Sequence, residues 1–273
     1  MKAPLYGLLL AGGRSTRMGR DKASMVLGAD GLNQAQRGIH ALARVCEKTF
    51  LSLREGQPAP EGCEGIETVC DKPGLGGPLA GILAAFEREP NAAWLVMACD
   101  LPFVTPEVLE NLVSARREDL PFRAYASSSD ALPEPLCAIY EPAAREILQA
   151  HAAKNHLCPR HILIEEKAPL LELPLTSRLA LENMNSPEDI ASASKEIHIC
   201  WFGALAEERG CREETLTTTA PNAGGFLEEC AARFGLAGLQ SHVRIAVNDE
   251  FARNEHPILS GDKVVFLKPF SGG

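Results

Sequence analysis

The sequence predicts a doubly wound α/β domain followed by a small α+β module. Two patterns carry this prediction. Strands and amphipathic helices alternate from residue 5 to about residue 190, and the rest of the chain has one main helix between pairs of strands. A length of 273 residues also fits two domains better than one. The pattern changes near 192–196, so we place the domains at 1–192 and 197–273.

Short apolar runs predict the strands of the first domain. The run Trp94–Ala98 is continuously apolar, which is typical of a central parallel strand buried on both faces. The other predicted strands are Leu5–Ala11, Thr49–Leu53, Glu67–Cys70 and Pro135–Tyr140.

Helices are predicted between these strands from apolar residues at three- and four-residue spacing and from start signals. One apolar face runs from Leu32 to Cys46, and Pro78 and Thr105-Pro106 mark two further helix starts. Glu141–Ala153 reads as helical, and Ser186 caps a last short helix.

The second domain is expected to be small and mixed. Its predicted strands are Ile197–Phe202, Val243–Val247 and Lys263–Leu267, and its main helix lies around Phe226–Phe234. One helix among several strands favours an α+β arrangement.

Composition and charge exclude several classes of protein. A hydrophobic fraction of 45% excludes a disordered chain, and a net charge of −9 opposes general binding to nucleic acid. No apolar run approaches the roughly 20 residues of a membrane span. The early run Leu8–Ala11 is too short for a signal peptide, so we expect a cytoplasmic protein.

The cysteines and histidines do not predict a metal site. The nine cysteines are odd in number and include no C-x-x-C pair. His156, Cys158 and His161 lie close together, but they are only three candidate ligands in an expected loop. We interpret them as structural residues.

A glycine- and arginine-rich loop follows the first strand, from Leu8 to Lys22. The small residues Ala11, Gly12 and Gly13 allow the backbone to approach a ligand, and successive N–H groups can bind anionic oxygens. Arg17 and Lys22 add positive charge where a triphosphate would need it. The loop matches neither the P-loop nor the dinucleotide-binding pattern.

The first domain resembles the molybdenum cofactor guanylyltransferases, within the nucleotidyltransferase superfamily and its Rossmann-like fold. The resemblance begins with L-A-G-G-x-S-x-R-M-G-x-D-K, from Leu10 to Lys22. It continues, in the order of the family, through Gly77-Pro-Leu-Ala-Gly81, Cys99-Asp-Leu-Pro102, Glu134-Pro-Leu136 and Asn183-Met-Asn185.

This resemblance implies transfer of GMP from GTP to the phosphate of molybdopterin, with release of pyrophosphate. It implies that Lys22 neutralises phosphates, that Asp71 contacts the nucleotide and that Asp100 holds Mg²⁺. The nucleotide-binding residues expected by similarity are Leu10, Ala11, Gly12, Gly13, Lys22, Asp71 and Asp100.

The chemistry needs positioning and charge neutralisation more than proton transfer, because the attacking phosphate is already an anion. We therefore expect Arg17, Lys22 and the Mg²⁺ at Asp100 to carry catalysis, without a general base.

Two departures from the family leave alternatives open. Leu53 stands where the family often has an asparagine, and Gly28–Gln36 lacks the usual pair of leucines. CTP or another nucleotide therefore remains an alternative to GTP. A second alternative is a first domain that binds a nucleotide without catalysis.

The end of the chain carries a second signal, Leu267-Lys-Pro-Phe-Ser-Gly-Gly273. Residues 197–273 resemble the small, sulfur-carrying subunit of molybdopterin synthase, a β-grasp, ubiquitin-like protein. The resemblance implies that a separate enzyme adenylates the Gly273 carboxylate and converts it to a thiocarboxylate. The large synthase subunit would then be the acceptor.

Overall fold

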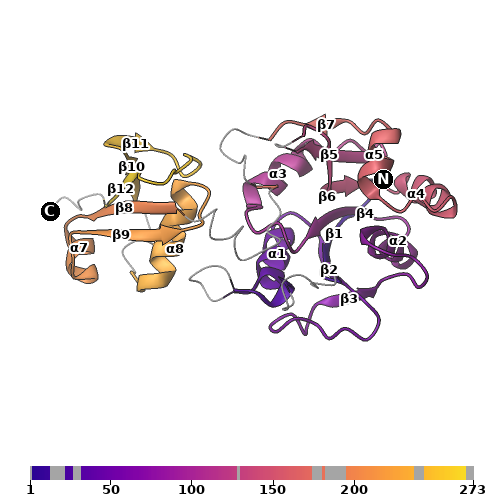
Figure 1. Cartoon of the computed structure of the whole chain (residues 1–273), viewed down its shortest axis with the longest axis horizontal. Coiled ribbons are helices and arrows are strands. Elements are labelled where there is room, and N and C mark those ends of the chain that lie inside the picture. Colours follow the sequence, from indigo (N-terminus) through magenta and orange to yellow (C-terminus); the bar gives the residue numbers. More distant parts are fainter. Residues whose placement is uncertain are drawn as a thin grey trace. The chain divides into compact units, whose positions relative to one another are not determined.

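The computed structural model describes residues 2–12, 22–26, 32–127, 130–173, 180–181, 195–236 and 243–268. The chain divides into two compact units, one with the elements up to β7 and one with those from β8 onward. Each unit is built around its own sheet (Figure 1). The predicted boundary at 192–197 falls at the edge of a segment outside the described residues, so it stays a prediction.

The first unit has a seven-stranded sheet in the order β3-β2-β1-β4-β6-β5-β7. Strands β3, β2, β1 and β4 are mutually parallel, whereas β6 runs antiparallel to both β4 and β5. The seven strands are β1 (Leu5–Leu10), β2 (Lys48–Leu53), β3 (Glu67–Cys70), β4 (Ala93–Ala98), β5 (Phe122–Ala126), β6 (Pro133–Tyr140) and β7 (Leu170–Leu171). The predicted parallel core is thus present, extended by an antiparallel half.

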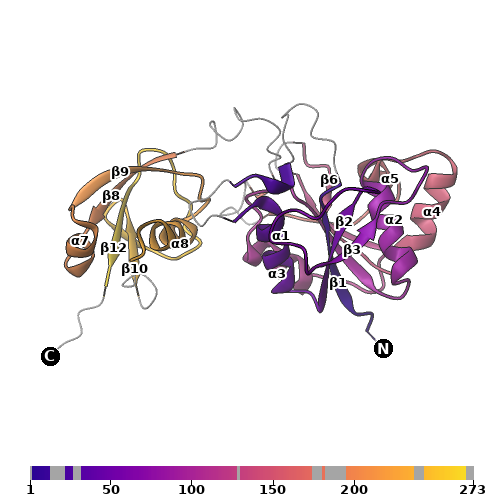
Figure 2. The ribbon, with the colours of Figure 1, turned by 90° about the horizontal axis from the view of Figure 1, so that it is seen from below.

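Helices cover both faces of this sheet, as Figure 2 shows. One face carries α1 (Gln34–Ala43) and α3 (Pro106–Ser114), which pack on Leu9 and Leu51. The other carries α2 (Pro78–Arg88), α4 (Ala144–Ala153) and α5 (Pro159–Glu165), which pack on Leu8 and Phe50. A single turn of 3₁₀ helix, η1 (Lys22–Ser24), precedes α1. The doubly wound prediction is confirmed.

One element prediction is wrong, and several elements were not predicted, β5 among them. The segment around His161 is not a loop, because Pro159 occupies the first turn of α5 and Ile162 and Leu163 are buried on its inner face. Strand β5 was not predicted at all. It pairs with β6, the next strand along the chain, and the register between them shifts at Ala124/Tyr125.

The second unit has a five-stranded mixed sheet in the order β11-β10-β12-β8-β9. The central pair, β12 and β8, is parallel, and the flanking pairs are antiparallel. The strands are β8 (Lys195–Trp201), β9 (Glu213–Thr218), β10 (Arg244–Val247), β11 (Glu250–Ala252) and β12 (Lys263–Leu267). This topology agrees with the predicted small α+β domain.

Helix α8 (Ala223–Phe234) packs across one face of the second sheet (Figure 2). Phe226 and Cys230 of the helix are buried with Ile199 and Phe266 of the strands. The shorter α7 (Ala204–Arg209) follows β8. In neither unit do the described residues include a helix that is both long and apolar enough to cross a membrane.

Candidate active site

A cavity of about 710 Å³ opens at the carboxyl edge of the parallel strands in the first unit. Six predicted nucleotide-binding residues line it, namely Leu10, Ala11, Gly12, Lys22, Asp71 and Asp100. Gly13 and Arg17, which the sequence also predicts here, lie outside the described residues. The structure therefore brings together all the predicted residues of this site that it describes.

Strand register explains why these residues meet. Leu10 of β1 is level with Ser52 of β2 on one side and with Ala98 of β4 on the other. Because the three strands are parallel, the chain leaves each of them at the same edge of the sheet. Asp71 follows β3 directly, and Asp100 lies two residues after the end of β4, so both carboxylates stand at this edge of the sheet.

Lys22 and Asp100 form an ion pair within this cavity, with Nζ 3.5 Å from Oδ2. The two side chains are only 19% and 24% exposed, so water screens their charges less than on an open surface. The other carboxylate oxygen, Oδ1 of Asp100, is buried and receives no hydrogen bond from any described residue. A buried, unsatisfied carboxylate oxygen fits a hard divalent cation such as Mg²⁺, which prefers oxygen ligands.

Asp71 is held by a neighbouring hydroxyl. Ser52 Oγ donates a hydrogen bond of 2.8 Å to Asp71 Oδ1, and Ser52 itself is buried. Burial raises the pKa of the Asp71 carboxyl, and the Ser52 hydrogen bond and the Arg54 charge oppose that rise. The Ser52 hydrogen bond thus fixes the direction of the Asp71 side chain at the cavity wall.

Two glycines let the backbone come close to this carboxylate. A Cβ added at Gly12 would lie 2.9 Å from Asp71 Oδ2, and one added at Gly81 would lie 2.3 Å from Ser52 Oγ. Neither distance is tolerated by real Cβ atoms. The absence of a side chain at both positions is therefore needed for the geometry of the Ser52–Asp71 pair.

The amino end of α2 also borders the cavity, through Gly76, Gly77 and Pro78. Gly77 caps the helix with φ at +70°, a conformation that favours glycine. Unpaired N–H groups and the helix dipole make such an end attractive to anions. The sequence block from Gly77 to Gly81 thus supplies a helix start that faces the cavity.

Leu53 does not line the cavity. Its side chain is 3% exposed and packs in the core with Leu51, while the flanking residues Ser52 and Arg54 face the cavity. Sequence reasoning missed both flanking residues. The alternation of side chains along a strand was the signal that could have found them, because Leu51 and Leu53 must share one face.

A second cavity of about 500 Å³ adjoins the first and shares with it Gly76, Gly77, Pro78 and Leu136. Arg160, near the start of α5, lines its other side. The Arg160 guanidinium donates hydrogen bonds of 3.0 Å to Asp130 Oδ2 and to Glu134 Oε2. Sequence reasoning missed Arg160, because the segment that carries it was expected to be a loop.

The carboxyl-terminal site can be followed only in part. Strand β12 ends at Leu267, and the tail that ends in Gly273 lies outside the described residues. The block Asn183–Asn185 and the helix expected after Ser186 lie outside them as well.

Comparison with protein families assigns both parts of the chain. A family model described as the MobA-like NTP transferase domain matches residues 7–170, and a model of the ThiS family matches residues 200–273. The first match covers the seven-stranded sheet up to β7, and the second covers most of the second unit.

Individual relatives agree with these matches. The "Molybdenum cofactor biosynthesis bifunctional protein" of Synechocystis is 36% identical over 188 residues, or 69% of this chain, but the match spans only 53% of that longer protein. A "Probable molybdenum cofactor guanylyltransferase" of Pelotomaculum thermopropionicum is 31% identical over 68% of this chain and 90% of its own length.

Among solved structures, molybdopterin-guanine dinucleotide biosynthesis protein A from Archaeoglobus fulgidus superimposes with a TM-score of 0.54 at 23% identity. The match covers 68% of this chain and 95% of that one. At this level of identity the likeness is one of fold.

Proposed function

Because the chain belongs to the MobA-like NTP transferase family, we propose that its first unit transfers GMP from GTP to molybdopterin and releases pyrophosphate. Relatives of this chain carry the name molybdenum cofactor guanylyltransferase. The observation that carries the proposal is the pairing of Lys22 with one oxygen of Asp100, which leaves the other oxygen buried and unsatisfied, among the described residues, beside an open cavity.

The residues of the cavity wall supply what a nucleotide triphosphate requires. Gly12 allows the backbone to approach the nucleotide, and Lys22 neutralises phosphate charge. The amino end of α2 adds N–H donors to the same wall. Asp71, oriented by Ser52, contacts the nucleotide.

Asp100 is the residue proposed to hold Mg²⁺, through the oxygen that Lys22 does not occupy. When bound, the ion would neutralise charge on the phosphates during transfer. Arg17 is proposed to add a further positive charge, and Gly13 a further backbone donor. No general base is needed, since the attacking phosphate is already ionised.

The adjoining cavity is proposed to receive the second substrate. It shares a glycine-rich wall with the nucleotide cavity, so a phosphate that enters from it can approach the α-phosphate of the nucleotide. Arg160 lines the far side of this cavity, with its guanidinium paired to Asp130 and Glu134.

The activity is tested with labelled GTP, molybdopterin and Mg²⁺, by following the dinucleotide product and pyrophosphate. Asp100→Ala should abolish both. Asp119→Ala removes the same charge from an exposed carboxylate paired with Arg117, away from the cavity, and should behave as wild type. If Asp100→Ala forms product at the wild-type rate, the proposed transferase mechanism is wrong.

The same assay separates the alternatives. A panel of GTP, CTP, ATP and UTP decides which base the site accepts. Ser52 and Arg54, rather than Leu53, face the nucleotide cavity. Tight binding in calorimetry without release of pyrophosphate would favour a non-catalytic, nucleotide-binding unit.

The second unit is proposed to be a sulfur carrier, on the basis of the ThiS-family match through Gly273. Its partners would be an adenylating, sulfur-transferring enzyme and the large subunit of molybdopterin synthase. Incubation with such an activating enzyme, ATP and a sulfur donor should exchange one carboxylate oxygen for sulfur, which intact-mass analysis detects. A chain without Gly272 and Gly273 should show no exchange, and exchange in that chain would refute the role.

A further inference from the structure

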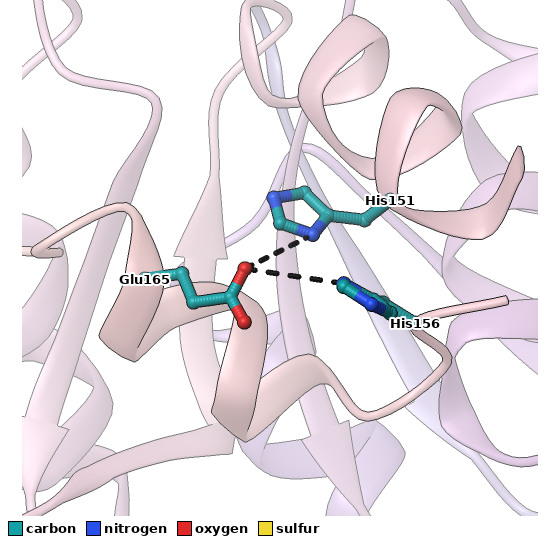
Figure 3. Close-up of side chains that lie close together, drawn as sticks. All are labelled: His151, His156 and Glu165. Atoms are coloured by element: carbon teal, nitrogen blue, oxygen red, sulfur yellow. Dashed lines mark ion pairs between the residues drawn. The ribbon is translucent and has the colours of Figure 1, made fainter. Parts of the chain in front are cut away.

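Two histidines and a glutamate of the first unit point toward one another (Figure 3). None of them lines the nucleotide cavity. His151 lies in the last turn of α4, Glu165 ends α5, and His156 lies between these helices. Three potential ligand atoms, one from each residue, lie within 4.8 Å of one another. None of these residues has a part in the proposed transferase chemistry.

The protonation of His151 follows from its contacts. Its Nε2 lies 2.9 Å from Glu166 Oε1. A carboxylate only accepts hydrogen bonds, so Nε2 carries a proton, and in the neutral imidazole the lone pair is therefore at Nδ1. That Nδ1 is buried and receives no hydrogen bond from the described residues.

The Nδ1 atom of His151 faces a second carboxylate, with Glu165 Oε2 at 3.6 Å. A lone pair that faces a carboxylate oxygen is repulsive unless a positive charge lies between them. A proton in that position would draw the two atoms to about 2.7–2.9 Å, the usual length of a charge-assisted N–H···O bond. The observed separation is longer than that bond, and it is that of a loose ion pair when the ring is protonated.

The distances from Glu165 to the two histidines are closer to those between ligand atoms that share a metal ion. Zn–N and Zn–O bonds of about 2.0–2.2 Å in a tetrahedral site place ligand atoms about 3.4 Å apart. His151 Nδ1 lies 3.6 Å and His156 Nδ1 4.0 Å from the same oxygen of Glu165. These two distances reach the tetrahedral value after shifts of up to about 0.6 Å, and all three ligand atoms already lie within 4.8 Å of one another. The side chains of His156 and Glu165, each 54% exposed, have room to move.

We propose that His151, His156 and Glu165 bind a zinc ion. Two imidazoles and one carboxylate suit Zn²⁺ better than Mg²⁺, which prefers oxygen ligands. Glu166 holds the ring of His151 in the ligating tautomer, the arrangement that carboxylates give to metal-bound histidines.

The site leaves the fourth position of a tetrahedral ion open to a small cavity of about 320 Å³, which Cys158 and His161 also line. The ion would tie the end of α4 to the end of α5. Since residues at the start of α5 line the cavity that adjoins the nucleotide site, the ion would also fix that wall.

The test is a zinc titration of the full chain against a chromophoric chelator, with excess Mg²⁺ present to fill the Asp100 site. Wild type should bind one Zn²⁺. His156→Ala and Glu165→Gln should weaken binding at least about 100-fold, and Glu166→Gln about 10- to 100-fold. The matched controls His40→Ala in α1 and Glu146→Gln in the first turn of α4 change the same residue types outside the cluster and should bind as wild type.

Cobalt separates this site from adventitious binding by the cysteines. Co²⁺ substitution should give the visible absorption of a tetrahedral site, lost in His156→Ala. A thiolate-to-cobalt band that disappears in His156→Ala would support the site with Cys158 as its fourth ligand. Equal zinc binding by wild type and Glu165→Gln, a thiolate band that survives His156→Ala, or no zinc binding by wild type would overturn the proposal.

Discussion

Lys22 Nζ lies 3.5 Å from Asp100 Oδ2, and this contact divides the two oxygens of one carboxylate between two roles. One oxygen faces a cation of the protein itself, and the other is buried without a described partner. An apo site with such an oxygen carries an unmet interaction, which a bound cation would satisfy. The Lys22–Asp100 ion pair also links the residue that ends the glycine-rich loop to the segment that follows β4.

Replacing Asp100 by asparagine tests this division of roles. The amide side chain keeps the shape of the carboxylate but loses the charge that holds both Lys22 and the cation. We expect the rate of pyrophosphate release to fall at least about 100-fold, the usual cost of removing one charge-stabilising group from a transfer site. Steady-state kinetics over a range of Mg²⁺ measures it. Asp119→Asn is the control, and a wild-type rate in Asp100→Asn would contradict the assigned role.

Asp71 should make stability fall as pH rises. Burial raises its pKa in the folded state, so the folded protein retains this proton after the unfolded chain has lost it. Stability is thus lost as pH rises from the unfolded pKa, about 3.9, to the raised folded value, and the penalty is complete above that window. Asp71→Asn removes the penalty while its carbonyl oxygen still accepts the Ser52 hydrogen bond.

The measurement is urea unfolding of wild type and Asp71→Asn without nucleotide or Mg²⁺. The variant should be the more stable protein at neutral pH, and the difference should vanish below about pH 3.9. Ser52→Ala should act in the opposite sense, because it removes the hydrogen bond that lowers the pKa of Asp71. A difference between wild type and Asp71→Asn that is constant with pH would contradict the explanation.

Replacing Gly81 by alanine tests how closely α2 must approach the Asp71 carboxylate. In a helix interior, alanine is more stabilising than glycine by about 1 kcal/mol. Here its Cβ would meet Ser52 Oγ at 2.3 Å and Asp71 Oδ1 at 3.1 Å, so the Ser52–Asp71 hydrogen bond must break or α2 must shift. Overpacking costs about 1–3 kcal/mol and the lost bond about 1 more, so Gly81→Ala should be less stable than wild type.

Gly65→Ala is the matched control for this substitution, since an added Cβ there meets no atom within 4 Å. It should leave stability unchanged or raise it by up to about 1 kcal/mol, through the entropy of the unfolded chain. Thermal unfolding of both variants provides the comparison. If Gly81→Ala is as stable as Gly65→Ala, the close approach has no energetic consequence.

Local patterns predicted the core of the first unit and the residues at its strand ends. Glu67–Cys70 and Lys263–Leu267 were predicted with the bounds that the structure has, and a glycine and a proline flank each of them. Lys22 and Asp100 were expected at the ligand edge because the loop of Lys22 and Asp100 itself both follow buried strands, whereas Asp71 was placed there by resemblance alone. A resemblance to a known family supplied their roles.

Features that depend on distant residues were not predicted. Pro159 was taken as a loop residue, although it begins a helix whose inner face is defined only by packing on the sheet. His151 and Glu165 lie on separate helices, so no sequence spacing marks them as neighbours. Strand β5 was missed for a different reason: its partner β6 is the next strand along the chain, but the register between them shifts at Ala124/Tyr125, which breaks a simple alternating pattern.

The first two residues of β8 should contribute to the stability of the second unit. The sequence places the start of this unit at residue 197, but β8 begins at Lys195. Lys195 is buried, and its Nζ donates a hydrogen bond of 2.8 Å to the carbonyl of Ala220. The carbonyl of Glu196 accepts another of 2.7 Å from the N–H of Gly261. A fragment of 195–273 should therefore fold, because its apolar core is formed by its own strands and α8.

A fragment of 197–273 lacks both hydrogen bonds and should be less stable than 195–273 by about 1–3 kcal/mol, at about 0.5–1.5 kcal/mol for each bond. Trp201 is 2% exposed and is the sole tryptophan of either fragment, so its fluorescence reports unfolding in urea. In the intact chain, Trp94→Phe leaves the same single reporter. Equal midpoints for the two fragments would show that the first two residues of β8 add nothing to stability, and would favour the boundary at 197.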